Sequence, residues 1–314
     1  MTNLLVFPGQ GSQFVGMGKA FADNFATSRE VYEEVNESLG QNLTKIMWEG
    51  DMDELTKTEN AQPAIMSVSI AVLRAIETEI GIDFSRVSYV AGHSLGEYSA
   101  LVAVRSLNLS VAAKLLRLRG QSMQKAVPLG EGAMAALIGA DINHAEDLVN
   151  NVTSKYPNRI CDIANDNAPG QVVVSGHADA IEAAMEISSD YGAKRALKLP
   201  VSAPFHSRLM EPAAEIMDDA FQDVSFSDPI VPLISNVTAS MVSSGYELHN
   251  LLVKQITERV RWTESIKYAF ENGIVTSIEI GAGKVLTGMI KRISGEANTI
   301  SVSEPNQIDE FKLK

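Results

Sequence analysis

Short apolar segments alternate with longer segments of helical periodicity along most of the chain. Residues 4–7 are continuously apolar, and 87–91 are rich in β-branched and aromatic residues, as is typical of buried strands. Apolar positions recur with helical spacing over 28–39 and 61–79, and a basic helix is predicted over 110–126. Strands that alternate with helices in this way indicate a mostly parallel sheet with helices on both of its faces.

The pattern changes after residue 127. Four strands and two helices are then predicted in the order βαββαβ, which is the order of a ferredoxin-like module. The strands span 133–139, 160–164, 171–175 and 195–199, the helices span 142–154 and 178–191, and a turn over 165–170 joins the second and third strands. Segments rich in glycine and proline at 128–132 and 200–204 border this module, so we predict that it is inserted into a larger α/β unit. The alternation resumes from Met210, with strands near 231–234 and 277–280.

The composition is that of a globular protein with a large core. Of the 314 residues, 45% are hydrophobic and 21% are charged, and the net charge of −13 argues against nucleic acid or an anionic membrane as the main partner. The single cysteine, Cys161, excludes an internal disulfide and favours a reducing compartment. The N-terminus lacks the basic region of a signal peptide, and no apolar run approaches the roughly 18 residues of a membrane span. We therefore expect a cytoplasmic protein, and a monomer because the sequence contains no coiled coil or repeated interface.

The sequence Gly92-His-Ser-Leu-Gly96 directly follows the predicted strand 87–91 and precedes a helical segment. This is the arrangement of a nucleophile elbow, in which a sharp strand-to-helix turn exposes a serine. Glycine is needed two residues to either side of the serine because the helix packs too closely on the strands to leave room for a Cβ atom. The bare pattern also occurs by chance, but the flanking strand and helix favour Ser94 as a nucleophile at a helix N-terminus.

A serine nucleophile needs a general base within hydrogen-bond reach, and histidine is the usual base near neutral pH. His206 is favoured because it lies in a proline-constrained loop directly after a predicted strand, where a side chain can be aimed. His93 is a poor candidate, because neighbouring side chains on a tight turn point apart. Surface or packing roles are expected for the other three histidines, His144, His177 and His249.

Two backbone donors are needed to stabilise the oxyanion that forms when a serine attacks a carbonyl group. One candidate is the N–H of Leu95, the residue after the nucleophile. The other is the N–H of Gln10, since Gly9 and Gly11 allow the loop after the first strand to approach closely. The same loop partly matches a dinucleotide-binding fingerprint, but Phe14 stands where that fingerprint needs a third glycine.

These residues make the chain similar to the malonyl-CoA:acyl carrier protein transacylase family. The matching segments run in the family's order over nearly the whole chain, at 7–13, 92–97, 119–120, 165–176, 205–207, 235–237 and 281–288. The resemblance implies an α/β-hydrolase-like catalytic domain over 1–127 and 200–314, with the ferredoxin-like insertion over 128–199.

The resemblance also implies a ping-pong reaction. Ser94 would attack the thioester of malonyl-CoA with His206 as the base, and the malonyl ester would pass to the phosphopantetheine thiol of holo-acyl carrier protein, supplying fatty-acid synthesis. No bound cofactor or metal is implied, because CoA and phosphopantetheine enter as parts of the substrates. Two alternatives stay open: an acyl-thioester hydrolase that uses the same serine and histidine, and a non-catalytic module that binds carrier protein.

The match assigns further roles within the site. Arg119 would hold the malonyl carboxylate, since a guanidinium group pairs with both carboxylate oxygens; the alternative is a solvent-facing arginine near the end of a helix. The main-chain carbonyl of Gln255 would orient the histidine, and Phe205 would disfavour a methyl branch at the malonyl α-carbon. Two more polar residues are expected to line the substrate site, Asn165 and Asn236.

Three residues depart from the family pattern: Asp166, Arg259 and Ala282. The first two concern the rim of the site. An acidic carrier protein also requires a local basic patch on an enzyme with a charge of −13. The candidates are Lys114, Arg117, Lys284, Lys291 and Arg292, although surface charges of this kind are most often simply solvated.

Overall fold

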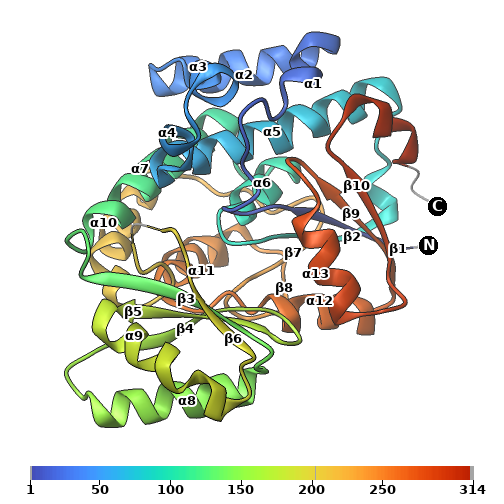
Figure 1. The fold of residues 1–314 in the computed structure, drawn as a ribbon. Helices are drawn as coiled ribbons and strands as arrows, with labels where there is room; N and C mark the ends of the chain where they lie inside the picture. The colour runs from blue at the N-terminus through green and yellow to red at the C-terminus, as the bar shows by residue number, and fades with distance from the viewer. Residues whose placement is uncertain (1, 202, 312–314) are drawn as a thin grey trace.

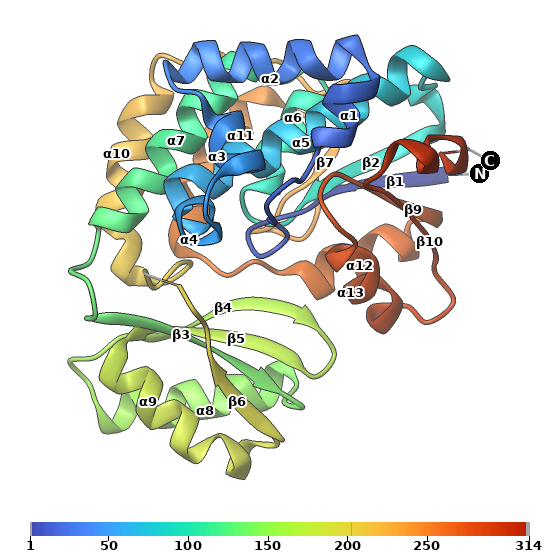
Figure 2. The same ribbon diagram turned by 45° about the horizontal axis from the view of Figure 1, so that its top comes forward.

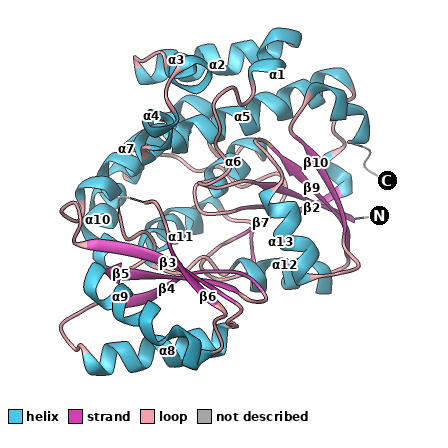
Figure 3. Ribbon diagram, in the orientation of Figure 1, coloured by secondary structure: helices cyan, strands magenta, loops and turns pink. Residues whose placement is uncertain are grey.

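The structure, a computed structural model, describes residues 2–201 and 203–311 (Figure 1). Met1, Ser202 and residues 312–314, which the predicted domains include, lie outside the described residues. The chain forms two units, each built around its own sheet (Figure 3). We call the unit that contains the six-stranded sheet the larger unit, and the segment 132–198 with its four-stranded sheet the inserted unit.

The larger sheet has the strand order β10-β9-β1-β2-β7-β8, and its neighbouring strands are parallel except for β7 and β8. The strands are β1 (Thr2–Phe7), β2 (Val87–Gly92), β7 (Leu233–Ile234), β8 (Met241–Val242), β9 (Ile274–Ile280) and β10 (Asn298–Val302). Phe7 at the end of β1 pairs with Gly92 at the end of β2. The loops that follow these two strands therefore lie next to each other at the carboxyl edge of the sheet, where open α/β sheets bind their ligands.

Strand β1 shows why this sheet is covered on both faces. Leu5 and Phe7 belong to one hydrophobic core, and Leu4 and Val6 belong to a separate core on the opposite face. Successive side chains of a strand point to opposite faces, so a continuous apolar run needs helices on both sides.

Helices α2 and α5 lie above the sheet in Figure 1, and α12 and α13 lie below it. The helices of the larger unit are α1 (Lys19–Asn24), α2 (Ala26–Leu39), α3 (Leu43–Glu49), α4 (Met52–Thr56), α5 (Thr58–Glu79), α6 (Gly96–Ala103), α7 (Leu109–Lys125), α10 (Glu211–Phe221), α11 (Gly245–Thr257), α12 (Trp262–Glu271) and α13 (Val285–Ile293). Among the described residues, no helix combines the length and the apolar character that a membrane crossing requires.

The inserted unit has an antiparallel sheet in the order β4-β5-β3-β6, with helices on the side that faces away from the larger unit (Figure 2). Its elements are β3 (Gly132–Ile138), α8 (Ile142–Lys155), β4 (Cys161–Ala168), β5 (Gln171–His177), α9 (Ala178–Ile187) and β6 (Arg195–Lys198). Ala133 and Ala135 of β3 face the core under these helices, whereas Met134 and Ala136 join the core of the larger unit. The predicted fold class is confirmed, and the domain boundaries at 127/128 and 199/200 stay a prediction.

One predicted element is wrong. The segment 165–170 was expected to be a turn because asparagine, aspartate, proline and glycine dominate it. Strand β4 instead continues to Ala168, and Pro169 and Gly170 alone form the turn. The strand persists because β5 pairs with it as far as Ala168, which lies opposite Gln171. The backbone of Val260 adds two hydrogen bonds: Val260 N–H donates to Ala164 O at 2.8 Å, and Asp166 N–H donates to Val260 O at 3.0 Å.

Candidate active site

Ser94 lies on a tight turn between β2 and α6, with a φ of 53° that places it in the left-handed region. A Cβ atom on Gly92 would come within 1.9 Å of the backbone of Gly96, and one on Gly96 would lie 2.3 Å from the carbonyl oxygen of Phe7. The two glycines therefore let the turn close against β1. The turn has the geometry that a nucleophile elbow requires.

His206 lies directly beside this serine. Its Nε2 is 2.8 Å from Ser94 Oγ, and its Nδ1 is 2.7 Å from the main-chain carbonyl oxygen of Gln255. A carbonyl oxygen only accepts hydrogen bonds, so Nδ1 carries the proton and Nε2 is free to accept the serine proton. Burial, together with the positive charge of Arg119, lowers the pKa of His206 from 6.5 to about 3. The imidazole is therefore neutral, as a general base must be.

The other four histidines are engaged elsewhere. His93 Nε2 pairs with Asn167 Oδ1 at 2.7 Å, and its ring meets Trp262 edge to face. The remaining three are His144, which is exposed, His177, whose Nδ1 accepts from Ile160 N–H, and His249, which pairs with Asp218.

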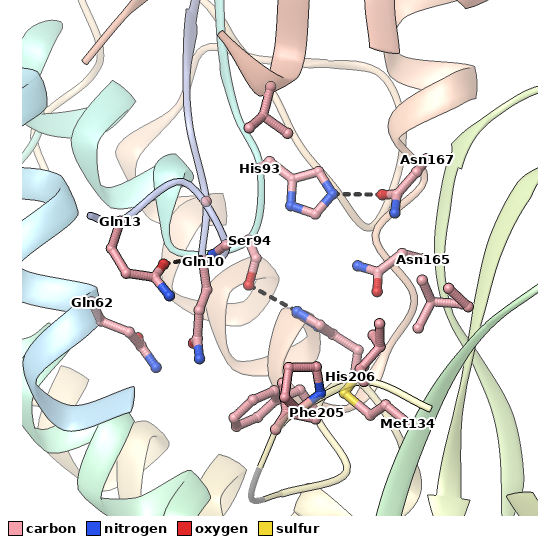
Figure 4. Close-up of a pocket in the computed structure, with 18 of the residues that line it drawn as sticks. Gln10, Gln13, Gln62, His93, Ser94, Met134, Asn165, Asn167, Phe205 and His206 are labelled. Carbon is pink, nitrogen blue, oxygen red and sulfur yellow. Dashed lines mark hydrogen bonds between the residues drawn. The ribbon is translucent and has the colours of Figure 1, made fainter. Parts of the chain in front are cut away.

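The loop after β1 lies against the elbow, as the parallel pairing of β1 and β2 requires. A Cβ atom on Gly9 would lie 2.5 Å from the carbonyl oxygen of His93, so only glycine allows this approach. Figure 4 shows Gln10 next to Ser94. Within residues 2–201 and 203–311, the backbone N–H groups of Gln10 and Leu95 have no hydrogen-bond acceptor. Both donors are available to an oxyanion formed on an acyl group at Ser94.

Arg119 on α7 is fully buried and points at the nucleophile. Its Nη2 lies 3.2 Å from Ser94 Oγ and 2.9 Å from Gln255 Oε1, and its Nη1 donates to Gln62 Oε1 at 2.8 Å. The alternative of a solvent-facing arginine is therefore wrong for Arg119. Among the described residues it forms no ion pair with a carboxylate, although the buried Glu97 is near enough to act on its charge. Burial lowers the pKa of Arg119, and the charge of Glu97 acts in the opposite direction. The site thus holds an unpaired buried cation, which would gain from a carboxylate-bearing ligand.

A cavity of about 380 Å³ opens in front of Ser94 and His206. Both units line it: the inserted unit contributes residues of β3, β4 and β5, and the larger unit contributes α13 and the loops around the elbow. Asn165, Asn167 and Met134 come from the inserted unit and face the same space as Phe205 (Figure 4). Asn165 and Phe205 therefore line the cavity, and their roles toward a substrate stay predictions.

Asn236 does not line this cavity, and its expected place at the substrate is wrong. The residue is fully buried, its Oδ1 accepts from Ser94 N–H at 2.8 Å, and its Nδ2 donates to Gly92 O at 2.7 Å. Both ends of the side-chain amide are thus bound to the backbone of the elbow. Asn236 holds the nucleophile's turn in place and leaves no polar atom for a ligand.

Three further residues belong to the site but escaped sequence reasoning: Gln62, Glu97 and Asn167. Gln62 lies within a helix whose apolar periodicity hides single polar positions, and Asn167 lies in the segment predicted as a turn. Glu97 directly follows the elbow motif, and a glutamate in the first turn of a helix is common because it interacts favourably with the helix dipole. Its position therefore did not mark it as part of the site.

Two of the residues that depart from the family pattern join the units beside the cavity. Asp166 is buried, and its Oδ1 accepts from Thr263 Oγ1 at 2.9 Å at the start of α12. Arg259 pairs with Glu146 of α8 at 2.9 Å. The third, Ala282, is buried, and its side chain is apolar. The first two departures affect how the inserted unit is attached, and none of the three contacts Ser94 or His206.

One of the basic candidates for carrier-protein docking, Arg292, contacts a residue that lines the cavity. Arg292 on α13 donates to Gln171 Oε1 and to Pro169 O, each at 2.6 Å, and so links α13 to the hairpin between β4 and β5. Arg117, in contrast, is half-buried and bonded to Asn60 and Gln41. A docking role stays a prediction for all five basic residues.

Residues 4–304 match the model of the acyl transferase domain family. The chain is 44% identical to malonyl CoA-acyl carrier protein transacylase of Bacillus subtilis, over 97% of this chain and 94% of that protein. It is 39% identical to the enzyme of the same name from Escherichia coli K12, over 96% of each chain.

Solved structures agree with these relatives. The acyl-carrier-protein-S-malonyltransferase of Bartonella henselae superposes with a TM-score of 0.95 at 49% identity, covering 99% of this chain and 98% of that one. A malonyl-transacylase solved in complex with a type II PKS acyl-carrier protein superposes with a TM-score of 0.94 at 37% identity, covering 98% of both chains.

Proposed function

The chain belongs to the acyl transferase family, and we propose that it transfers a malonyl group from malonyl-CoA to the phosphopantetheine thiol of holo-acyl carrier protein. One observation carries the proposal. A base and a buried, unpaired cation meet at one oxygen atom: His206 Nε2 lies 2.8 Å and Arg119 Nη2 lies 3.2 Å from Ser94 Oγ. A nucleophile that stands beside a carboxylate-binding group fits an acyl substrate with a free carboxylate.

In the first half-reaction, Ser94 Oγ attacks the thioester carbonyl carbon of malonyl-CoA while His206 Nε2 accepts the hydroxyl proton. The N–H groups of Gln10 and Leu95 stabilise the tetrahedral oxyanion. When the intermediate collapses, the C–S bond breaks and the proton on His206 passes to the CoA sulfur. Malonyl-Ser94 and free CoA result.

In the second half-reaction, the phosphopantetheine thiol gives its proton to His206 and its sulfur attacks the malonyl ester. The C–O bond to Ser94 then breaks, and the same proton returns to Ser94 Oγ. One base serves both halves because His206 starts and ends each of them neutral. The Gln255 carbonyl that accepts from Nδ1–H keeps the ring in the orientation that both steps need.

We assign Arg119 to the malonyl carboxylate. Its two contacts with the amides of Gln62 and Gln255 fix the plane of the guanidinium group, and its Nε has no partner among the described residues. The buried cation therefore keeps donor capacity for a substrate, and a carboxylate there would form the direct ion pair that the nearby buried carboxylate of Glu97 does not form with Arg119. An acyl group without a carboxylate gains nothing from this arrangement.

Phe205 and Asn165 complete the acyl pocket. The Phe205 ring lines the cavity next to His206, where it leaves little room for a branch at the α-carbon, and we propose a preference for malonyl over methylmalonyl. Asn165 offers a side-chain amide to the substrate from the opposite wall (Figure 4).

We propose that the enzyme works without a resident cofactor or metal, since CoA and phosphopantetheine arrive with the substrates. The acyl carrier protein is a transient partner, in keeping with the related transacylase that was solved with one. We further propose a cytoplasmic monomer that supplies fatty-acid synthesis.

The test is intact-mass analysis after mixing with malonyl-, acetyl- or methylmalonyl-CoA in the absence of carrier protein. We expect one malonyl group per chain, located at Ser94 by peptide mapping and absent in Ser94→Ala. Adding holo-acyl carrier protein should discharge the ester onto its thiol. Continuous release of CoA without an adduct would instead identify a thioester hydrolase. The absence of any reaction would favour a non-catalytic module that binds carrier protein.

A further inference from the structure

Two buried amide side chains hold the nucleophile from behind. Asn236 binds Ser94 N–H through its Oδ1, and Gln255 Nε2 donates to Ser94 O at 3.0 Å. Gln255 also accepts from Arg119 through Oε1 and from His206 through its main-chain oxygen. These two residues therefore position every group that the proposed reaction uses at Ser94, except the oxyanion donor of Gln10.

One carboxylate connects these two residues. Glu97, in the first turn of α6, is 1% exposed; its Oε1 accepts from Asn236 N–H at 2.8 Å, and its Oε2 accepts from the side-chain amide of Gln255. Its own backbone N–H donates to Ser94 O at 3.0 Å. Glu97 lies outside the cavity lining and thus cannot reach a substrate in this arrangement.

From these contacts we infer that Glu97 is a positioning residue for acyl transfer, which fixes Asn236 and Gln255 and through them the relative placement of Ser94, His206 and Arg119. The inference rests on the proposed function. It adds a buried acid whose contribution is to hold the geometry of Ser94 and His206.

The free-energy cost of burying the Glu97 carboxylate supports a role for this residue beyond packing. An ionised carboxylate away from water is unfavourable, and burial raises the pKa of Glu97 to about 7. The N–H groups of Asn236 and Gln255 and the positive charge of Arg119 act in the opposite direction and favour the charged form. An apolar residue of similar size would avoid this cost, but it would leave both amide donors without their acceptor.

The experiment compares Glu97→Gln and Glu97→Ala with the wild type in two assays. The first is the single-turnover rate of Ser94 acylation as a function of malonyl-CoA concentration. The second is the rate at which phenylmethanesulfonyl fluoride modifies Ser94, followed by intact mass. The sulfonyl fluoride reports the alignment of serine and histidine without using malonyl recognition.

For Glu97→Ala we expect the maximal acylation rate to fall on the order of 100-fold, since displacements of about 1 Å have this effect on aligned groups. Sulfonylation should fall in parallel, while the half-saturating concentration of malonyl-CoA changes little. Glu97→Gln keeps the volume and one acceptor oxygen, so it should lose less in both assays.

Glu279→Gln is the matched control. Glu279 is another buried glutamate of the larger unit, and its two oxygens accept from the N–H groups of Leu286 and Thr287. We expect it to lower the melting temperature while leaving sulfonylation of Ser94 unchanged.

Wild-type sulfonylation in Glu97→Gln, or equal rates in Glu97→Gln and Glu279→Gln, would overturn the inference even if Glu97→Ala fails to fold. The proposed function can fail separately: wild-type enzyme that is sulfonylated but not acylated by malonyl-CoA would refute malonyl transfer, while the comparison of sulfonylation rates would still test Glu97.

Discussion

The larger unit and the inserted unit contribute different things to the same cavity. In the larger unit the polar side chains are buried and bonded to one another: among the described residues, both partners of Ser94 Oγ, His206 and Arg119, belong to it. The inserted unit contributes a wall in which polar Asn165 and Asn167 stand among apolar side chains. One unit therefore fixes the reacting groups, and the other shapes the space in front of them.

The attachment between the units follows the same division. His93 meets Asn167 at 2.7 Å next to the nucleophile, and Asp166 meets Thr263 at 2.9 Å on the other side of β4. Asn165 and Asn167 of this strand thus line the cavity, whereas Asp166 between them points to Thr263 of the larger unit. The comparison teaches that changes in the larger unit should act on the rate of the chemical step, and changes in the inserted unit on binding.

Removal of the base is the strongest test of this division. His206→Ala should lower kcat by roughly 10⁴- to 10⁶-fold, as losses of single members of such groups do, with KM within a few-fold of wild type. Rapid-quench measurement of malonyl-Ser94 formation checks it. A loss confined to KM would contradict the assignment of the base.

Arg119→Ala should change the selectivity between acyl groups rather than the rate of one chemical step. A buried ion pair with the substrate is lost, so malonyl transfer should fall roughly 10²- to 10³-fold while acetyl transfer falls much less. Competition between malonyl-CoA and acetyl-CoA, read out by intact mass, measures the ratio directly. Arg117→Ala, at the half-buried neighbour two residues away, is the control. Equal losses for both acyl groups would remove the carboxylate assignment.

Asn167→Ala tests the side of the cavity that the inserted unit lines. It removes the partner of His93 and one polar group of the cavity, which should raise KM for malonyl-CoA about tenfold, the size of one buried hydrogen bond, with kcat nearly unchanged. Asn151→Ala, on the exposed side of α8 in the same unit, should behave as wild type. If kcat fell instead, the inserted unit would take part in the chemical step.

The smallest expected effect concerns stability and pH. The unfolded chain binds a proton at His206 below about pH 6.5, whereas the folded chain binds it only near pH 3, so the free energy of unfolding falls as the pH falls. Between pH 6.5 and 5.5 this residue should contribute a loss of about 1 kcal/mol. The stability of His206→Gln relative to wild type should rise by that amount, which urea titrations at the two pH values would detect. Parallel behaviour of the two proteins would show that His206 is not held neutral.

The sequence predicted best what depends on local pattern. The strand, the two glycines and the helix around Ser94 are contiguous, so their geometry follows from neighbours in the chain. The order of elements in the inserted unit was also predictable, because it is one uninterrupted segment with turns between its strands. His206 could be selected among few histidines by the constrained loop around it.

What escaped prediction depends on distant segments. Strand β4 continues through a sequence typical of a turn because β5 pairs with it as far as Ala168, and because Val260, nearly a hundred residues later, adds two hydrogen bonds that no local pattern predicts. Asn236 carries a side-chain amide suited to substrate, but the fold places that amide against the elbow's backbone. Glu97 gains its importance only from Asn236 and Gln255, which no local pattern connects to it.

Ser94 and His206 share a feature with a consequence for directed evolution. Their φ angles are 53° and 54°, in the left-handed region that glycine adopts with less strain than any residue with a side chain. Glycine at either position would relieve backbone strain and remove a reacting group at once. The gain is clearest at Ser94, whose side chain is small, whereas glycine at His206 would also empty a buried site and orphan the carbonyl of Gln255. A laboratory selection for heat resistance alone would therefore favour glycine at Ser94, and a thermostable transferase has to be selected for turnover in every round.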